Sequence, residues 1–187
     1  MTSGKIIVGI KHTMSGHSKW QQIRHKKTLT DKKRGQIFSK LSRLITLATK
    51  KGTDPKTNPS LAQAIEKAKA ASMPKENIDR AIKKISDKNQ VQLEELSIEA
   101  IGPGRIALKV KVITDNHNRT IAEIKKILND YDSKMVSPGS LSWMFNQSVS
   151  ITNPTDQEKL DKLMYALDDQ DEVEDVDSNL SEDSPTI

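Results

Sequence analysis

The fold class of this chain is decided by the stretch Gly102-Pro-Gly-Arg-Ile-Ala-Leu-Lys-Val-Lys-Val-Ile-Thr114. After the Gly-Pro-Gly segment, apolar side chains occupy every second position from Ile106 to Val112. An alternation with a period of two is typical of a strand with one buried face, and the glycines and proline before it indicate a turn. We therefore predict a β-hairpin over residues 96–114.

The chain after this hairpin contains further periodic segments. They predict a helix near residues 118–131, a strand within 141–151, a helix over 155–168 and an edge strand that contains Val173 and Val176. The order ββαβαβ favours an open sheet with helices packed on one face.

The chain before the hairpin has helical periodicity. Thr30-Asp31 begins a first helix that runs to Gly52, Asn58-Pro59 begins a second and Pro74 a third. Ser, Thr, Asp and Asn are favoured at the N-cap, and proline fits the first turn. Residues 30–86 are therefore predicted to form three amphipathic helices that leave Lys and Arg outside.

These elements together define an α+β fold class and a domain organisation. We expect an upstream extension over residues 1–13, a basic three-helix domain over 14–88 and a small α/β sandwich over 89–177. The last residues, 178–187, have the composition of a disordered acidic tail.

Charge is strongly segregated along the chain. Residues 14–88 contain 19 basic and 6 acidic residues, a net charge of +13, whereas residues 148–187 carry −10. A basic segment of this density attracts polyanions, because neutralising phosphates releases condensed counterions. We predict that residues 14–88 bind nucleic acid; the alternative is a basic surface that only keeps the protein in solution.

The residue types argue against catalysis and against cofactors. The chain has no cysteine, which excludes disulfides, zinc fingers, iron–sulfur clusters and thiol chemistry. Its four histidines lack metal-ligand spacing, and no phosphate-binding glycine loop or Ser/His/Asp order is present. The segment 115–119 surrounds His117 with helix-capping residue types, so we interpret it as a helix entry rather than a catalytic site. We predict a non-enzymatic protein without metal, cofactor or small-molecule substrate.

The longest apolar run near the start, residues 5–10, is too short to span a membrane and lacks the pattern of a cleaved signal peptide. We therefore expect a cytoplasmic protein without a membrane partner.

An ordered series of short motifs runs from residue 14 to residue 146. It comprises Met14-Ser-Gly-His-Ser-Lys-Trp20, Lys32-Lys-Arg-Gly-Gln-Ile-Phe38, Thr53-Asp-Pro55 with Asn58-Pro59, Met73-Pro-Lys75, Arg80-Ala-Ile-Lys83, Gly102-Pro-Gly104, Thr114-Asp-Asn-His-Asn-Arg-Thr120 and Gly139-Ser140. No single motif is specific, but the ordered set resembles the YebC family.

The resemblance implies a helical domain, a central α/β domain and a further α/β domain inserted into the central one. The insertion is expected to be absent here, because Leu141 to Phe145 is followed within a few residues by a segment, 149–179, that resembles the end of the central domain. The resemblance also implies a DNA-binding transcriptional regulator. The alternative is a ribosome-associated translation factor that contacts ribosomal RNA, a role known for relatives.

The best candidates for contact with phosphates are the cations that cluster at the start of the basic domain, because Lys and Arg on flexible stems reach a nucleic-acid backbone without reading its sequence. The predicted binding set is Lys19, Trp20, Arg24, Lys26, Lys27, Lys32, Lys33, Arg34 and Lys40. Trp20 is included because an indole ring among cations can stack on a base, although it can equally cover the helices.

Three further points follow from the pattern. Trp143 and Phe145 share one face of the predicted strand, and we favour the core over a base-stacking platform for both. No helix presents Asn, Gln and Arg on one face, which weakens sequence-specific readout of DNA. The acidic segment that includes residues 168–177 is expected to compete weakly with nucleic acid for the basic domain, and a pure protein-interaction role for it is a third, weaker hypothesis.

Overall fold

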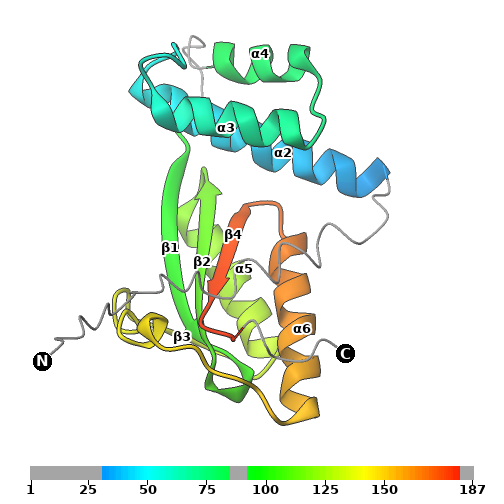
Figure 1. Ribbon diagram of the computed structural model, residues 1–187, viewed down its shortest axis with the longest axis vertical. Helices are drawn as coiled ribbons and strands as arrows, with labels where there is room; N and C mark the ends of the chain where they lie inside the picture. Colours follow the sequence, from blue (N-terminus) through cyan, green and yellow to red (C-terminus); the bar gives the residue numbers. More distant parts are fainter. Residues whose placement is uncertain (1–30, 85–91, 182–187) are drawn as a thin grey trace, which may run out of the picture.

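The computed structural model describes residues 31–84 and 92–181, apart from the side chain of Lys32. A helical domain, residues 31–84, lies across one end of a sheet domain, residues 92–181 (Figure 1). The α+β class predicted from the sequence, with helices first and then a ββαβαβ order, is confirmed. The predicted extension over residues 1–13 lies outside the described residues.

The helical domain contains the three predicted helices. Helix α2 spans Asp31–Ala48 and continues into a short 3-10 turn, η1, Thr49–Lys51, that ends at Gly52. Helix α3 spans Pro59–Ala70, and helix α4 spans Lys75–Lys83. The predicted beginnings at Asn58-Pro59 and Pro74 are confirmed.

Asn58 explains the sharp corner between α2 and α3. Its side-chain oxygen accepts a hydrogen bond from the backbone N–H of Leu61, which caps α3. Its Nδ2 group donates to the carbonyls of Ala48 and Gly52, at 2.8 and 2.7 Å. One buried amide thus satisfies the end of one helix and the beginning of the next.

The apolar stripes of the helical domain form a core of their own. Its buried members are Leu41, Ile45, Ala48, Leu61, Ala64, Ala68, Met73, Ile78 and Ala81. Within each helix these residues are three or four positions apart, as an amphipathic helix requires.

The sheet domain is built on four strands in the order β3-β1-β2-β4, all paired antiparallel. They span Glu94–Ile101 (β1), Ala107–Thr114 (β2), Lys134–Val136 (β3) and Val173–Ser178 (β4). Helices α5, His117–Asp130, and α6, Pro154–Asp169, pack against one face of the sheet (Figure 1). The turn between β1 and β2 is the predicted Gly-Pro-Gly turn, which forms the short 3-10 segment η3, Pro103–Arg105.

A second core fills the space between this face and the two helices. Its largest fully buried side chains are Ile106, Leu108, Val110, Val112, Ile124, Leu128, Leu160, Leu163, Leu167 and Val173. The cores of the two domains share no residue.

The strand predicted within residues 141–151 is wrong. The third strand is β3, which precedes Pro138-Gly139, and the predicted segment forms turns with a short 3-10 helix, η4, Met144–Asn146. The backbone N–H of Leu141 donates to the buried carboxylate of Glu99, and the N–H of Val149 donates to the carbonyl of Asn179. These hydrogen bonds take the place of the strand pairing that we predicted from the apolar residues of this segment.

The core assignment of Trp143 is also wrong, and that of Phe145 holds only in part. Trp143 is 62% exposed, and Phe145 is half-buried. The reason is the same, since without a strand these two side chains do not share a buried face.

The predicted disordered tail begins too early. Ser178 ends β4, and Asn179 is buried, its Oδ1 atom accepting from the N–H of Ala107 at 2.8 Å. Leu180 forms a parallel bridge with Val149. Residues 182–187 lie outside the described part of the chain.

Candidate nucleic-acid interface

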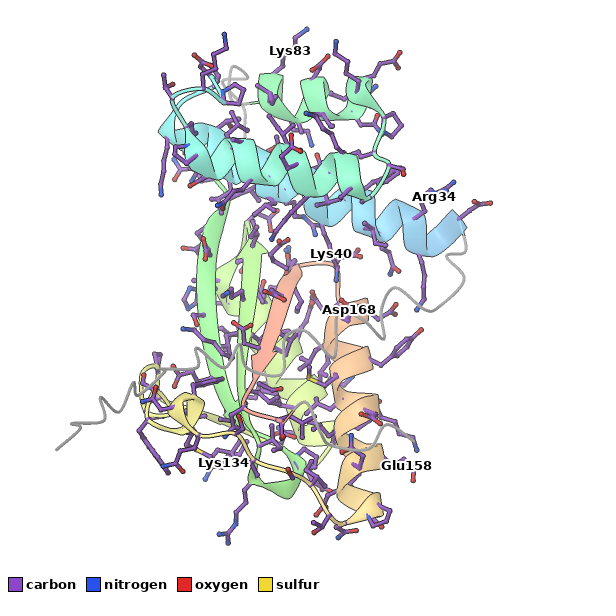
Figure 2. The ribbon with its side chains drawn as sticks, viewed as in Figure 1. Arg34, Lys40, Lys83, Lys134, Glu158 and Asp168 are labelled. Atoms are coloured by element: carbon purple, nitrogen blue, oxygen red, sulfur yellow. The ribbon has the colours of Figure 1, made fainter. Side chains whose placement is uncertain are left out.

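One face of α2 carries polar side chains at positions 33, 36, 40 and 43. Spacings of three and four place these residues in a row along the helix. The row faces the end of the sheet domain where α6 stops and β4 begins, and Figure 2 shows Lys40 pointing from α2 toward Asp168. We call residues 168–174 the acidic corner, because five of these seven positions are Asp or Glu.

The side chains of this row are bound to the acidic corner and to α6. Lys33 Nζ donates to the hydroxyl of Tyr165 at 2.5 Å and lies 4.2 Å from the centroid of its ring, which is a cation–π contact. Lys40 Nζ donates to the carbonyl of Asp168 and lies 3.8 Å from its carboxylate. Arg43 donates to the carbonyl of Asp171 at 2.5 Å. The cations thus lie at the negative end of the α6 dipole, where positive charge is favoured.

Helix α3 adds an ion pair to the same contact. Lys67 Nζ is 3.0 Å from Glu174 Oε1, and the Glu174 side chain is 14% exposed, against 58% for Lys67. Burial raises the pKa of the Glu174 carboxyl above its ordinary value, while Lys67 opposes the shift. The carboxylate is therefore held by its partner in a site that does not favour its charge.

A different group of cations lies on exposed positions of α4 and of the loop between α2 and α3. We call it the outer basic set, and it comprises Lys51, Lys56, Lys75, Arg80, Lys83 and Lys84. Helix α4 lies on the side of the helical domain away from the sheet domain, and Figure 2 shows Lys83 pointing outward from it. Within the described residues, none of these six side chains is seen bonded to an acidic side chain.

The outer surface is positive although not purely so. Glu76 and Asp79 are exposed on α4 between the basic residues. Lysines on exposed, flexible stems suit phosphate oxygens along a backbone, whereas a helix that reads bases needs planar donors such as Asn, Gln and Arg directed into a groove. This surface can therefore attract a phosphate backbone, and Arg80 is the one member of the outer basic set with a planar donor group of the kind that reads bases.

The predicted binding set is divided by the structure. Lys19, Trp20, Arg24, Lys26 and Lys27 lie outside the described residues, as does the side chain of Lys32. Arg34 is exposed near the N-terminal end of α2 (Figure 2). Lys33 and Lys40 face the acidic corner instead of open solvent. The role of the whole set in binding stays a prediction.

Sequence reasoning passed over the outer basic set, although a signal was present. The apolar positions of α4 point Ile78 and Ala81 inward, so that Lys75, Arg80 and Lys83 fall on the opposite side. These three residues are five and three positions apart, so they form no dense basic run of the kind found between residues 19 and 34.

The open face of the sheet has mixed charge. Lys111 lies 3.2 Å from Asp177 and 3.9 Å from Asp175. Burial acts to lower the pKa of Lys111, but these two carboxylates outweigh it and hold the pKa above its ordinary value. Since the strands carry acids opposite their lysines, this face is a poor site for a polyanion.

The predicted helix entry at residues 115–119 is confirmed. Asn116 is the N-cap of α5, and its side chain accepts from the N–H of Arg119. Arg119 also pairs with Asp115, at 2.6 Å, and with the buried carboxylate of Glu172. The hydroxyl of Thr120 donates to the same carboxylate. These contacts attach the beginning of α5 to the acidic corner.

The pairing of Glu172 gives a prediction for stability. Burial acts to raise the pKa of Glu172, but hydrogen bonds from Thr120 and Arg119 and the charge of Arg119 outweigh it, so the pKa lies below its usual 4.5. A depressed carboxyl pKa stabilises the fold above the unfolded pKa, and the stabilisation is lost as the pH falls through the folded value. We expect Glu172→Gln to lower the free energy of unfolding by about 2 kcal/mol at pH ~7.

Urea denaturation at about pH 7 and at decreasing pH measures this difference, which should begin to shrink below about pH 4.5, because the unfolded carboxyl takes up a proton there before the native carboxyl does. Glu158→Gln is the matched control, since Glu158 is an exposed carboxylate paired with Lys162 one helical turn away. An equal decrease in stability in both variants would contradict the role given to Glu172.

Among residues 31–84 and 92–181, each helix is too short or too polar to cross a bilayer. The same residues hold no group of three or more His, Cys, Asp or Glu side chains arranged to bind a metal ion.

Two models of known protein families match this chain, one over the helical domain and one over most of the sheet domain. The model described as the TACO1/YebC protein N-terminal domain matches residues 18–88, and the model described as the TACO1/YebC second and third domain matches residues 93–156. The chain therefore belongs to the TACO1/YebC family, as its motifs predicted.

Relatives of this chain bear a common name. A probable transcriptional regulatory protein of Petrotoga mobilis is 44% identical over 169 residues, which cover 89% of this chain and 67% of the relative. One from Prosthecochloris aestuarii is 51% identical over 136 residues, which cover 72% of this chain and 54% of the relative. The chain thus spans between about half and two thirds of the length of these relatives.

A solved structure shows the same fold. A conserved hypothetical protein of Aquifex aeolicus superposes with a TM-score of 0.80 at 28% sequence identity. The superposition covers 90% of this chain and 98% of that protein.

Proposed function

We propose that this chain is a non-enzymatic regulator of gene expression that binds nucleic acid through its helical domain. The observation that carries the proposal is the separation of charge within the fold. The outer basic set is exposed on one side of the helical domain, while acids gather at the end of the sheet domain. The names of the relatives, probable transcriptional regulatory proteins, support a role in regulation.

The mode of binding follows from the residue types. Lysines contribute point charges that neutralise phosphates, and the accompanying release of counterions supplies most of the affinity of non-specific binding. We propose that duplex DNA is held along its backbone and that sequence preference is low. Selection of target sites would then come from DNA shape or from a second protein.

Ribosomal RNA is the second candidate ligand, and one observation favours it. The exposed side of α4 carries Lys75, Glu76, Asp79, Arg80 and Lys83, a row without Asn or Gln for reading adenine in the major groove. A protein of this kind suits structured RNA, which is recognised largely through its shape and backbone. Cosedimentation with ribosomal particles, rather than with nucleoid DNA, would favour this candidate.

The test replaces three members of the outer basic set, as Lys75→Ala, Arg80→Ala and Lys83→Ala in one chain. At about 100 mM salt, a cation that no longer neutralises its phosphate weakens binding by roughly eightfold, so we expect at least a tenfold increase in the dissociation constant. Fluorescence anisotropy with a labelled DNA duplex and with a ribosomal RNA hairpin measures it for both ligands.

The matched control removes the same charge from the sheet domain, as Lys125→Ala, Lys126→Ala and Lys134→Ala. All three lysines are exposed. A change of no more than about twofold is expected there, because only long-range charge is altered. Equal weakening in both triple variants would rule out the outer basic set as the binding surface.

A further inference from the structure

The hydrogen bonds that α2 and α3 form with Tyr165 of α6 and with the acidic corner share one direction. All are donated by basic or amide side chains of the helical domain to oxygens of the sheet domain. The donors are Lys33, Gln36, Lys40, Arg43 and Lys67, and the acceptors are the hydroxyl of Tyr165, the carbonyls of Asp168, Asp169 and Asp171, and the carboxylate of Glu174.

The acceptors resemble a nucleic-acid backbone in chemistry. They form a row of oxygens, some charged and some at the negative end of a helix dipole, that follows the row of cations on α2. A phosphate backbone offers the same kind of acceptors to the same donors. Because the Lys40 side chain is only 11% exposed where it contacts Asp168, a phosphate cannot reach its ammonium group while the two domains are in contact there.

We propose that the acidic corner is an internal competitor for nucleic acid, which occupies the cations of α2 and α3 until a polyanion displaces it and the two domains separate there. The inference rests on the proposed function. In the closed arrangement the outer basic set is exposed and available to the ligand, as is Arg34. In the open arrangement Lys33, Lys40, Arg43 and Lys67 join it.

The contact is built so that it can open. The two hydrophobic cores share no residue, so each domain keeps its own core when the corner is released. The Glu174 carboxylate lies in a desolvating site, so its charge adds little to folding. The Lys67 end of that pair is largely exposed, and exposed pairs are weak and sensitive to salt.

The structure also shows which acidic side chains contact the helical domain. Glu172 and Asp175, which the sequence grouped with the competing acids, pair within the sheet domain with Arg119 and Lys111. Asp168 and Glu174 are the acids whose carboxylates approach lysines of the helical domain.

The test compares two double variants that remove the same charge. Asp168→Asn with Glu174→Gln removes the side-chain acids of the contact. Asp132→Asn with Glu158→Gln removes two acids of the sheet domain that pair with Lys159 and Lys162, and Figure 2 shows Glu158 at the end of the sheet domain remote from α2. Removing each of these two partly exposed ion pairs should change an equilibrium constant by about twofold to threefold, so we expect the first variant to bind a labelled DNA duplex about fivefold more tightly than the wild type at about 50 mM salt. The control variant should change by less than about twofold.

A second readout follows the separation of the domains. The chain has no cysteine, so Ser60→Cys on α3 and Thr155→Cys at the start of α6 provide two unique sites for a donor and an acceptor dye. We expect energy transfer to fall when the same duplex saturates the wild-type chain, and to start lower in the first double variant.

The inference stands only if both results are obtained. Equal affinities of the two double variants, or energy transfer that does not change at saturation, would overturn it while leaving the proposed function intact. A wild-type chain that binds neither the duplex nor a ribosomal RNA hairpin would overturn the proposed function and the competition together.

Discussion

Raising the salt concentration from about 50 to about 200 mM is expected to weaken binding of the full chain to nucleic acid by about a thousandfold. The estimate assumes roughly six neutralised phosphates, each of which releases counterions whose return to the free ligand is favoured by added salt. Residues 14–88 carry a net charge of +13, which is enough for six contacts. The measurement is a series of anisotropy titrations at increasing potassium chloride.

The slope of the logarithm of affinity against the logarithm of salt concentration is the informative quantity. A slope near −5 agrees with about six contacts to duplex DNA. The variant Lys75→Ala, Arg80→Ala and Lys83→Ala should have a slope shallower by up to about three. An affinity that does not depend on salt would refute electrostatic binding altogether.

Leu61→Ala is expected to lower the free energy of unfolding of the helical domain by about 3 kcal/mol. Leu61 is fully buried in the core that α3 shares with α2 and α4. Removing its side chain leaves a cavity that the short helices cannot fill. Because the sheet domain has a separate core, amide hydrogen exchange should accelerate in α3 and remain slow in β2.

Leu108→Ala is the reciprocal variant, since Leu108 is fully buried in the core of the sheet domain. Its exchange should accelerate across β1 and β2, with α3 little affected. If either substitution accelerates amide hydrogen exchange equally in both domains, the chain unfolds as one cooperative unit, and the two cores do not stabilise their domains independently.

The sequence predicted the helices and the hairpin well because their signals are local. Asn58-Pro59 and Pro74 restrict the backbone within one turn, and the alternation from Ile106 to Val112 requires one buried face. In these elements, propensity, capping and hydrophobic period agree.

The strand prediction for residues 141–151 was wrong because the conformation of this segment depends on residues far away in the chain. The carboxylate of Glu99 and the carbonyl of Asn179 accept its backbone N–H groups, and nothing in the local sequence reveals these partners. Apolar residues alone suggested a strand, and the exposed Trp143 shows that hydrophobicity without a ladder does not define a buried face.

The candidate site was predictable in composition but not in arrangement. The charge count located the basic domain, because net charge needs no knowledge of contacts. It did not show that Lys33 and Lys40 meet Tyr165 and Asp168, which lie more than a hundred positions further along the chain. The contact between α2 and the acidic corner is what distinguishes Lys33 and Lys40 from the exposed cations of the outer basic set.

Asn179 joins two segments at the end of the sheet domain. Its side-chain oxygen accepts from the N–H of Ala107, and its own N–H donates to the carbonyl of Ala107. Its Nδ2 group donates to the carbonyl of Met144. Two residues further on, the N–H of Ser181 still bonds to Val149. A shortening that removed Asn179 would break these hydrogen bonds to Ala107, Met144 and Val149, and the segment that exposes Trp143 would become a fluctuating surface instead of a defined one.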